Sequence, residues 1–266
     1  MIGTILTEAV PPITTADAGA YSTAIGEAPT AGAVSPFYAI ALFGPLWQRV
    51  QREIGDQGIV HIDQRILVHR RLPAGRPLTA AVRITGVAGF GRHDAVLVHS
   101  TLSTVDGSPV ASLRSTLAAP GDGHDRPPLR RPPDPARLGE AVRLERRFDD
   151  AAPARYAEAS GDQNPVHLDE EAARAAGFPG RVVHGMCVLA TGATAVAAEL
   201  GGHREPGLGY LRARFARPVL PGDTVEYVAH RTGAFGTYRL GASVDGRAVF
   251  RSGLLRFRQC SRTGPE

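Results

Sequence analysis

Lysine is absent from the 266-residue sequence, and all 30 residues of its Lys+Arg count are arginines. This absence excludes a Schiff-base lysine, a lysine general base and a phosphate-binding loop built on lysine. The arginines give a formal net charge of +4, but they run from Arg49 to Arg262 without a dense block among aromatic residues. We therefore interpret most of them as surface charge and predict no nucleic-acid partner.

Cysteine is also scarce. Cys187 and Cys260 cannot form a disulfide framework, and no Cys/His cluster has the spacing of a zinc site. We expect a reducing, cytoplasmic compartment. The most apolar stretch, residues 182–200, contains His184 and many Ala, Gly and Thr residues, so we expect no membrane span. Acidic Glu8 without a basic flank makes the N-terminus a poor signal peptide.

A proline-rich segment near the middle divides the chain. Residues 119–138 hold six prolines and scattered charges, which favour neither a helix nor a strand ladder. The sequences on its two sides repeat weakly, since the segment from Tyr21 to Glu27 is similar to the segment from Tyr156 to Asp162. The predicted organisation is an N-terminal unit over residues 1–118, a Pro/Arg-rich linker over residues 119–140 and a C-terminal unit over residues 141–266.

Each side has the pattern of one apolar helix followed by a series of strands. The helices are expected at residues 37–53 and 185–200, the second closed by Gly201 and Gly202. Tight turns separate the strands, so both sheets should be largely antiparallel. The predicted strands cover residues 59–71, 77–88, 94–105, 109–118, 207–218, 223–232, 235–244 and 247–258. This pattern indicates an α+β duplication whose two sheets join edge to edge around both helices.

The densest group of reactive side chains lies in residues 156–187. Asp162 and His167 are five positions apart and would point away from each other in a continuous helix. Pro165 prevents such a helix because it supplies no N–H and disfavours helical backbone at Asn164. In the resulting turn the carboxylate and the imidazole can converge on one water, which suits general acid–base chemistry. The alternative is structural: Asp162 and Asn164 would only shape the turn, and His167 would start the next helix.

A second group of polar residues comes just before the predicted helix at residues 185–200. Gly185 would present a backbone N–H at the positive end of the helix dipole, where it could bind the oxygen of a polarised carbonyl. Gly185 could instead serve only to pack the helix closely on the sheet, and His184 could be a packed side chain rather than a reacting one. Cys187 lies inside this helix and is expected in the core.

These residues resemble a known family. The pattern Y-A-x-x-S-G-D-x-N-P-x-H, followed by H-G-M at residues 184–186, is similar to the hydratase 2 motif of MaoC-like (R)-specific enoyl-thioester hydratases and 3-hydroxyacyl-thioester dehydratases. Residues 211–223 also resemble the strand and turn that come next in this family. The resemblance implies a double hot-dog fold, in which two antiparallel sheets, each wrapped around a long helix, form one continuous sheet. The first half looks like the degenerate N-terminal hot dog of such proteins.

The resemblance also implies roles for individual residues. Asp162 and His167 would be the catalytic pair that holds the water, Asn164 would help to orient them, and Gly185 N–H would bind the thioester oxygen. The reaction would be the reversible hydration of trans-2-enoyl thioesters to (R)-3-hydroxyacyl thioesters in fatty-acid metabolism, with no metal or other cofactor. Glu27 stands where Asp162 stands, but no Asn-Pro-x-His comes after it. The first half should therefore be inert and form a wall along the acyl chain.

The implied partner is an acyl-CoA or an acyl carrier protein thioester, because both end in a phosphopantetheine arm. Arg181, Arg212 and Arg214 are candidates for contacts to a phosphate or an acidic carrier, against the alternative of ordinary surface positions. A hot-dog acyl-CoA thioesterase, a non-catalytic acyl-thioester-binding subunit, and a dehydratase acting on a branched or short dicarboxylic CoA ester remain open. One chain supplies both halves, so a monomer and a homodimer are both compatible with the sequence.

Overall fold

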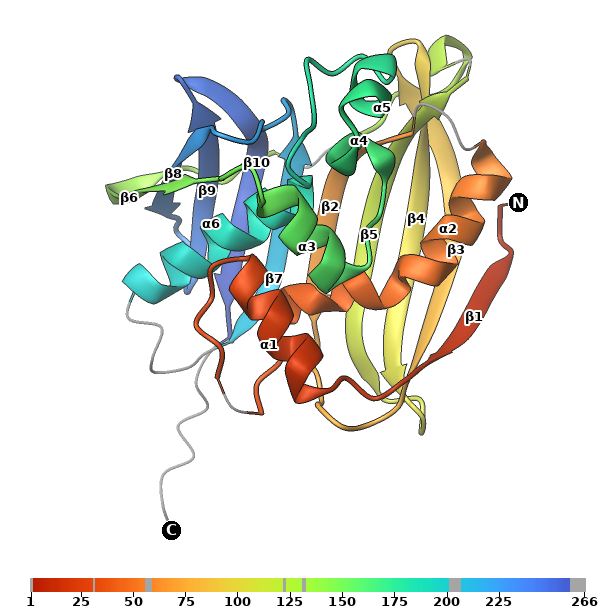
Figure 1. The fold of residues 1–266 in the computed structure, drawn as a ribbon, viewed down its shortest axis with the longest axis horizontal. Helices are drawn as coiled ribbons and strands as arrows, with labels where there is room; N and C mark the ends of the chain where they lie inside the picture. Colours follow the sequence, from red (N-terminus) through yellow and green to blue (C-terminus); the bar gives the residue numbers. More distant parts are fainter. Residues whose placement is uncertain are drawn as a thin grey trace.

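A single ten-stranded sheet forms the framework of the protein, and helices cover one of its faces (Figure 1). The computed structural model describes residues 2–30, 32–55, 59–121, 123–130, 133–200 and 207–258. The strands are β1 (Ile5–Val10), β2 (Val60–Val68), β3 (Leu78–Phe90), β4 (His93–Thr104), β5 (Pro109–Pro120), β6 (Leu138–Arg147), β7 (Leu208–Phe215), β8 (Thr224–Arg231), β9 (Thr237–Val244) and β10 (Arg247–Phe257). The helices are α1 (Thr15–Ala24), α2 (Gly44–Ile54), α3 (Ala152–Ser160), α4 (Pro165–Leu168), α5 (Glu170–Ala175) and α6 (Gly185–Glu199), with 3-10 helices η1 (Pro36–Phe43) and η2 (Gly123–Asp125).

The two halves of the chain join at the centre of the sheet, between β2 and β7. These strands pair antiparallel, from Asp63 opposite Arg214 to Leu67 opposite Tyr210. The strands then continue outward in the order β5, β4, β3, β1 on one side and β10, β9, β8, β6 on the other. The two halves therefore repeat one arrangement, and the predicted α+β duplication with sheets joined edge to edge is confirmed.

Helix α6 is the central helix of the second half and is buried along most of its length. Its close packing on β8 depends on Gly192, because a Cβ at this position would lie 2.1 Å from Cε1 of Tyr227. The hydroxyl of Tyr227 donates a hydrogen bond to the carbonyl of Val188 at 2.7 Å. The small residues of this helix thus hold it against the sheet and fix the position of its first residue, Gly185.

The helix predicted over residues 37–53 is interrupted in the structure. Residues up to Phe43 form η1, and the α-helical part α2 begins only at Gly44. Pro45 accounts for the change, since it has no N–H to donate and its ring excludes the carbonyl four residues earlier. Leu46 and Val50 of α2 are buried against the first half of the sheet.

The two edge strands, β1 and β6, were not among the strands expected from the sequence. Strand β6 is largely exposed and rich in charge, which suits an edge but hides the alternation of a half-buried strand. The predicted linker over residues 119–140 is accordingly shorter, because β5 extends to Pro120 and β6 starts at Leu138. Gly201, Gly202 and Cys260 lie outside the described residues. No helix in the described ranges is long and apolar enough to cross a membrane.

The repeated tyrosines of the two halves meet near the centre of the molecule. Helices α1 and α3 pack together, and the hydroxyls of Tyr21 and Tyr156 lie 3.2 Å apart. Tyr21 also donates to the carbonyl of Phe37 at 3.2 Å. Both rings are fully buried, so the contact between the two hydroxyls joins the halves where water is excluded.

Candidate active site

Asp162 lies in the turn between α3 and α4. Gly161 ends α3 in the left-handed region, with φ of 73°, and donates its N–H to the carbonyl of Ala157 at 2.9 Å. The backbone N–H of Asp162 donates to the hydroxyl of Ser160 at 3.2 Å. The carboxylate itself is exposed and accepts a hydrogen bond from the backbone N–H of Asn164 at 3.3 Å. The predicted interruption of the helix is confirmed, and it leaves the carboxylate open at the end of α3.

His167 lies in the short helix α4, which Pro165 begins. Its Nδ1 is 2.7 Å from the carbonyl oxygen of Val182. Because a carbonyl oxygen can only accept, Nδ1 carries the hydrogen and Nε2 of the neutral ring is left as an acceptor. The N–H of Val182 in turn donates to the carbonyl of Val166 at 3.2 Å. The segment before α6 therefore fixes both the orientation and the tautomer of this imidazole.

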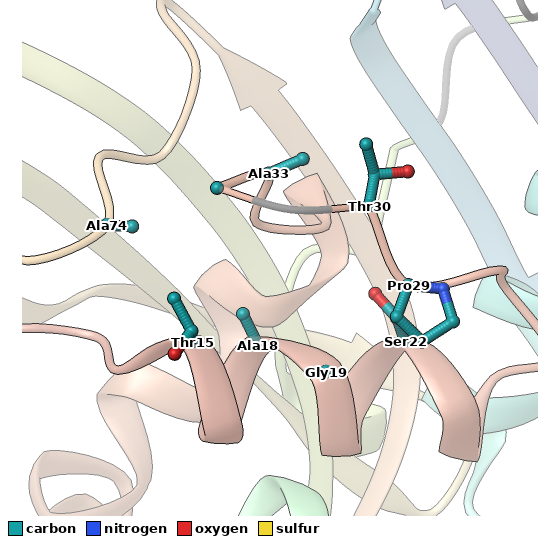
Figure 2. A pocket seen from close by; sticks show the side chains of 9 residues that line it. Thr15, Ala18, Gly19, Ser22, Pro29, Thr30, Ala33 and Ala74 are labelled. Carbon is teal, nitrogen blue, oxygen red and sulfur yellow. The ribbon is translucent and has the colours of Figure 1, made fainter.

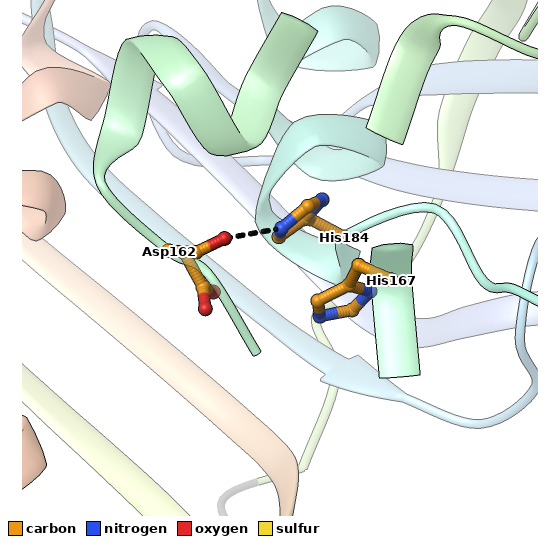
Figure 3. Close-up of side chains that lie close together, drawn as sticks. All are labelled: Asp162, His167 and His184. Atoms are coloured by element: carbon orange, nitrogen blue, oxygen red, sulfur yellow. Dashed lines mark hydrogen bonds between the residues drawn. The ribbon is translucent and has the colours of Figure 1, made fainter. Parts of the chain in front are cut away.

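His184 lies next to both Asp162 and His167, as Figure 3 shows. It is 2% exposed, and its Nε2 donates to the backbone carbonyl of Asp162 at 3.0 Å. Its ring stacks on that of His167, with centroids 3.6 Å apart and an interplanar angle of 25°. The sequence left His184 between a packed and a reacting role, and these contacts make it a positioning residue for the other two.

The three side chains form one electrostatic unit. One ligand-type atom from each of Asp162, His167 and His184 lies within 4.8 Å of the others. Burial lowers the pKa of His167, while the Val182 carbonyl and the Asp162 carboxylate oppose the shift. Burial and, to a smaller extent, positive charge on His167 lower the pKa of His184 to about 4, although Asp162 opposes the shift. Both imidazoles are therefore neutral near pH 7, and Nε2 of His167 can accept a proton.

Gly185 is the first residue of α6, so its N–H has no partner within the helix. The positive end of the helix dipole adds to the attraction of this N–H for a negatively charged oxygen. A Cβ at Gly185 would lie 3.0 Å from Cε1 of Phe215. Glycine thus lets the ring of Phe215 approach the start of the helix and leaves no methyl group beside the N–H.

His61 brings the first half of the chain into the site. It lies on β2, with its ring centroid 5.2 Å from that of Phe215 and 5.6 Å from that of Trp47. Burial lowers the pKa of His61 to about 4, while the carbonyl of Asp63 and, more weakly, the carboxylate of Asp162 oppose the shift. The sequence analysis missed this residue, because the pattern of one strand does not show which residues of the other half it meets. Its position at the start of a predicted strand gave no signal of its own, because Asp63, Gln64 and Arg65 make the same strand polar.

The equivalent turn of the first half has different contacts. The Glu27 carboxylate accepts a hydrogen bond from the Ser22 hydroxyl at 3.2 Å. Beside it, α1, the adjoining loop and Ala74 line a pocket of about 120 Å³ (Figure 2). Sites for small-molecule ligands usually measure about 300–1,000 Å³. This pocket is too small for an acyl thioester.

The other predicted site residues have mixed outcomes. The side chain of Asn164 accepts from the N–H of Val166 at 3.3 Å and caps α4, so only its backbone N–H orients Asp162. The prediction that Arg212 contacts phosphate is wrong, because its buried guanidinium donates to Asp134 at 2.7 Å. Arg181 contacts the carboxylate of Glu170 through its backbone N–H at 3.1 Å and through Nε at 3.7 Å. Its contact with phosphate stays a prediction, as does the contact of Arg214.

The absence of a metal also stays a prediction. Aspartate and histidine are residue types that bind divalent metals, and Asp162, His167 and His184 lie close enough to share one. Two of the ring nitrogens are engaged by backbone carbonyls, which suits a hydrogen-bonded pair as well as a metal site.

Comparison with known proteins identifies a known domain in the second part of the chain. Residues 123–244 match the family model of the MaoC like domain. The 3-hydroxyacyl-thioester dehydratase Y of Mycobacterium tuberculosis is 33% identical over 205 residues, which cover 73% of this chain and 65% of that protein. Residues 123–244 therefore form a MaoC-like domain. The matched domain contains Asp162, His167 and Gly185, so the resemblance seen in the motif is confirmed.

Further comparisons add a second curated relative and support the fold. The enoyl-CoA hydratase ChsH3 of Mycobacterium tuberculosis is 29% identical over 174 residues, covering 63% of this chain and 59% of that protein. The chain thus aligns with less than two thirds of the length of these two curated relatives. The crystal structure of a MaoC-like dehydratase from Phytophthora capsici superimposes with a TM-score of 0.84 at 21% identity, covering 98% of this chain and 97% of the other. The predicted double hot-dog fold is confirmed.

Proposed function

We propose that this MaoC-like protein is a hydro-lyase that catalyses the reversible hydration of trans-2-enoyl thioesters to (R)-3-hydroxyacyl thioesters in fatty-acid metabolism. One observation carries the proposal: the exposed carboxylate of Asp162 and the imidazole of His167 lie together with His184, the residue directly before the first N–H of α6. The names of the curated relatives, a dehydratase and an enoyl-CoA hydratase, support the same reaction.

The geometry suggests how the residues divide the work. Asp162 and His167 each accept a hydrogen bond from one water, which directs its oxygen lone pair at C3 of the enoyl group. One member of the pair takes the proton of the attacking water, and a proton is delivered to C2 from the same face. The N–H of Gly185 binds the thioester oxygen as it gains the charge of an enolate. Because the two groups interact closely, their protons are exchanged as a coupled pair.

The substrate carrier would be CoA or an acyl carrier protein, and no cofactor is required by these steps. A cytoplasmic location fits the buried thiol of Cys187, whose pKa burial raises to about 12 and which is therefore unreactive. One chain supplies both Asp162 and the facing wall around His61, so we expect activity from a monomer and from a homodimer alike.

The direct test is an assay of the purified chain with trans-2-enoyl-CoAs of increasing chain length. Hydration removes the conjugated double bond, so the absorbance of the enoyl thioester should fall without release of free thiol. A thiol reagent in a parallel reaction detects hydrolysis, and thiol release at the rate of absorbance loss would instead identify a thioesterase. If neither CoA esters nor acyl carrier protein esters react, the proposed function is wrong.

A further inference from the structure

A row of basic side chains crosses the first half of the sheet. Arg83 on β3 lies directly opposite His99 on β4, His99 opposite Arg114 on β5, and Arg114 opposite Arg65 on β2. We call these four residues the basic row. Adjacent strands are about 4.8 Å apart, so the row is about 14 Å long. Arg83 is exposed between the buried residues of β3, so the row lies on the face opposite the core and the helices.

The basic row carries charge that the described residues do not balance. Like charges directly opposite each other on paired strands destabilise a sheet. No hydrogen bond or ion pair holds Arg83 or Arg114 within the described part of the chain. Burial lowers the pKa of His99, and the charges of Arg114 and Arg83 lower it further, which places both guanidinium groups near this ring. The facing carboxylate is that of Asp63, 3.5 Å from Nε of Arg65.

The second half of the sheet shows how such a row can be neutralised. There the line of directly opposed residues continues across the strands beyond the basic row. It passes from Arg65 to Arg212, then to Leu254 and to Arg239. Asp134, from the segment that connects the halves, accepts hydrogen bonds from Arg212 at 2.7 Å and from Arg239 at 3.3 Å. One carboxylate thus serves both arginines of the second half.

The described residues of the same connecting segment do not neutralise the basic row. It crosses the end of β3, where Leu129 donates to the carbonyl of Gly89 at 3.1 Å. Leu129 and Arg130 then line a cleft of about 410 Å³ together with the basic row, Thr85 and the carboxylate-bearing Asp63. The segment therefore adds a further arginine where it adds an aspartate in the second half. The volume lies within the range of sites for small-molecule ligands.

We propose that this cleft binds a small anion with two or more phosphate groups, such as the phosphate end of a nucleotide. Guanidinium groups pair with phosphate oxygens through two parallel hydrogen bonds, and adjacent phosphates match side chains spaced by one strand. The cleft encloses a volume of nucleotide size, and its charges do not extend as a track along the surface. The site lies on the sheet face away from Asp162, and the proposal does not depend on the proposed reaction.

The test is isothermal titration calorimetry of the full chain at low salt with inorganic pyrophosphate, ATP and CoA as separate probes. The double variant Arg83→Gln, Arg114→Gln should bind at least about 10-fold more weakly, because it loses charge-assisted hydrogen bonds to phosphate oxygens. The matched control is Arg147→Gln, which removes one exposed arginine from β6 and should leave the affinity unchanged.

The probes separate the two sources of such a phosphate. Binding of pyrophosphate and ATP points to a free nucleotide, and binding of CoA without ATP points to the phosphate end of the thioester carrier. In either case the loss of binding in the double variant supports the site. Equal affinity of the double variant and the wild type would overturn the proposal, as would the absence of binding by all three probes. Urea unfolding provides the control for folding, and the double variant should be at least as stable as the wild type because opposed like charges are removed.

Discussion

Tyr21 and Tyr156 occupy equivalent places in the two halves, and a carboxylate comes six residues after each of them. Glu27, the carboxylate of the first half, accepts a hydrogen bond from a serine hydroxyl. Asp162, the carboxylate of the second half, faces the ring of His167 across a gap of less than 4.8 Å. Two equivalent turns therefore have different chemistry.

The difference arises from the residues after the turn. In the second half Pro165 starts a new helix that carries His167 back toward Asp162, whereas the first half continues through Pro29 into a loop without histidine. The first half has a different part in the site, since His61 on β2 lies within electrostatic reach of Asp162. In the proposed mechanism the second half holds the reacting groups, and the first half contributes His61 near them.

Replacement of His167, which has no counterpart after the equivalent turn of the first half, should cause the largest loss of activity. His167→Gln keeps a hydrogen-bonding side chain but cannot exchange a proton near neutrality, so turnover should fall by about 10²-fold or more. The control is His69→Gln in the first half, an exposed imidazole that contacts the hydroxyl of Ser112. Turnover of the control should equal that of the wild type. A His167→Gln enzyme within a few-fold of wild type would remove His167 from the mechanism.

A methyl group at the start of α6 should have a smaller effect. In Gly185→Ala the new Cβ would lie 3.0 Å from the ring of Phe215, so the helix start or the ring must shift by a few tenths of an ångström. Displacing the N–H that binds the enolate should lower kcat by about 10-fold, less than the loss expected when such a donor is removed. Adding Phe215→Leu should restore part of the rate by making room. A single variant with unchanged kcat would show that the N–H is not used.

Acid should destabilise the protein through the imidazoles around Asp162. Burial depresses the pKa of His61, His167 and His184 below the value of about 6.5 expected in an unfolded chain. The unfolded state therefore binds more protons between about pH 6.5 and 4, and the free energy of unfolding must fall as the pH drops through this range. Urea unfolding at a series of pH values measures the slope, and His61→Gln should make it shallower. A midpoint that does not change with pH would contradict the burial of these rings.

Loss of the contact between the repeated tyrosines should have the smallest of the four effects predicted for these changes. Tyr21→Phe removes the hydroxyl that donates to Phe37 and contacts Tyr156, which should lower the free energy of unfolding by about 1 kcal/mol. The hydroxyl does not touch the reacting groups, so activity should be unchanged. Chemical denaturation measures the first quantity and the hydration assay the second. A large loss of activity with unchanged stability would mean that the contact serves the reaction rather than the packing of the two halves.

Much of the fold was predictable from patterns within single elements. The paired strands between the turns, the helix after Gly185 and the break at Pro165 depend on local alternation, spacing and proline chemistry, which a sequence displays directly. The interruption of the first helix at Pro45 was also visible in principle, because proline cannot continue a helix. Strand β6 was not, since an exposed edge strand has little apolar alternation to detect.

The site was predictable where its residues are neighbours in sequence and not where the fold brings them together. Asp162, His167 and Gly185 belong to one motif. His61 and the pairing of Arg212 with Asp134 depend on contacts between distant segments, which are set by strand register and by the path of the connecting segment. The sequence pattern of a single strand does not show which residues of a distant strand will lie opposite it.

The most direct test of the account is to compare Asp162→Asn with Glu27→Gln in the hydration assay. The two changes remove one negative charge each from equivalent turns, and both side chains keep their size. We expect Asp162→Asn to reduce turnover by about 10²-fold or more with an unchanged fold, because the carboxylate holds the reacting water, and Glu27→Gln to retain the wild-type rate. Equal losses in the two variants, or full activity in Asp162→Asn, would contradict the assignment of the chemistry to the second half.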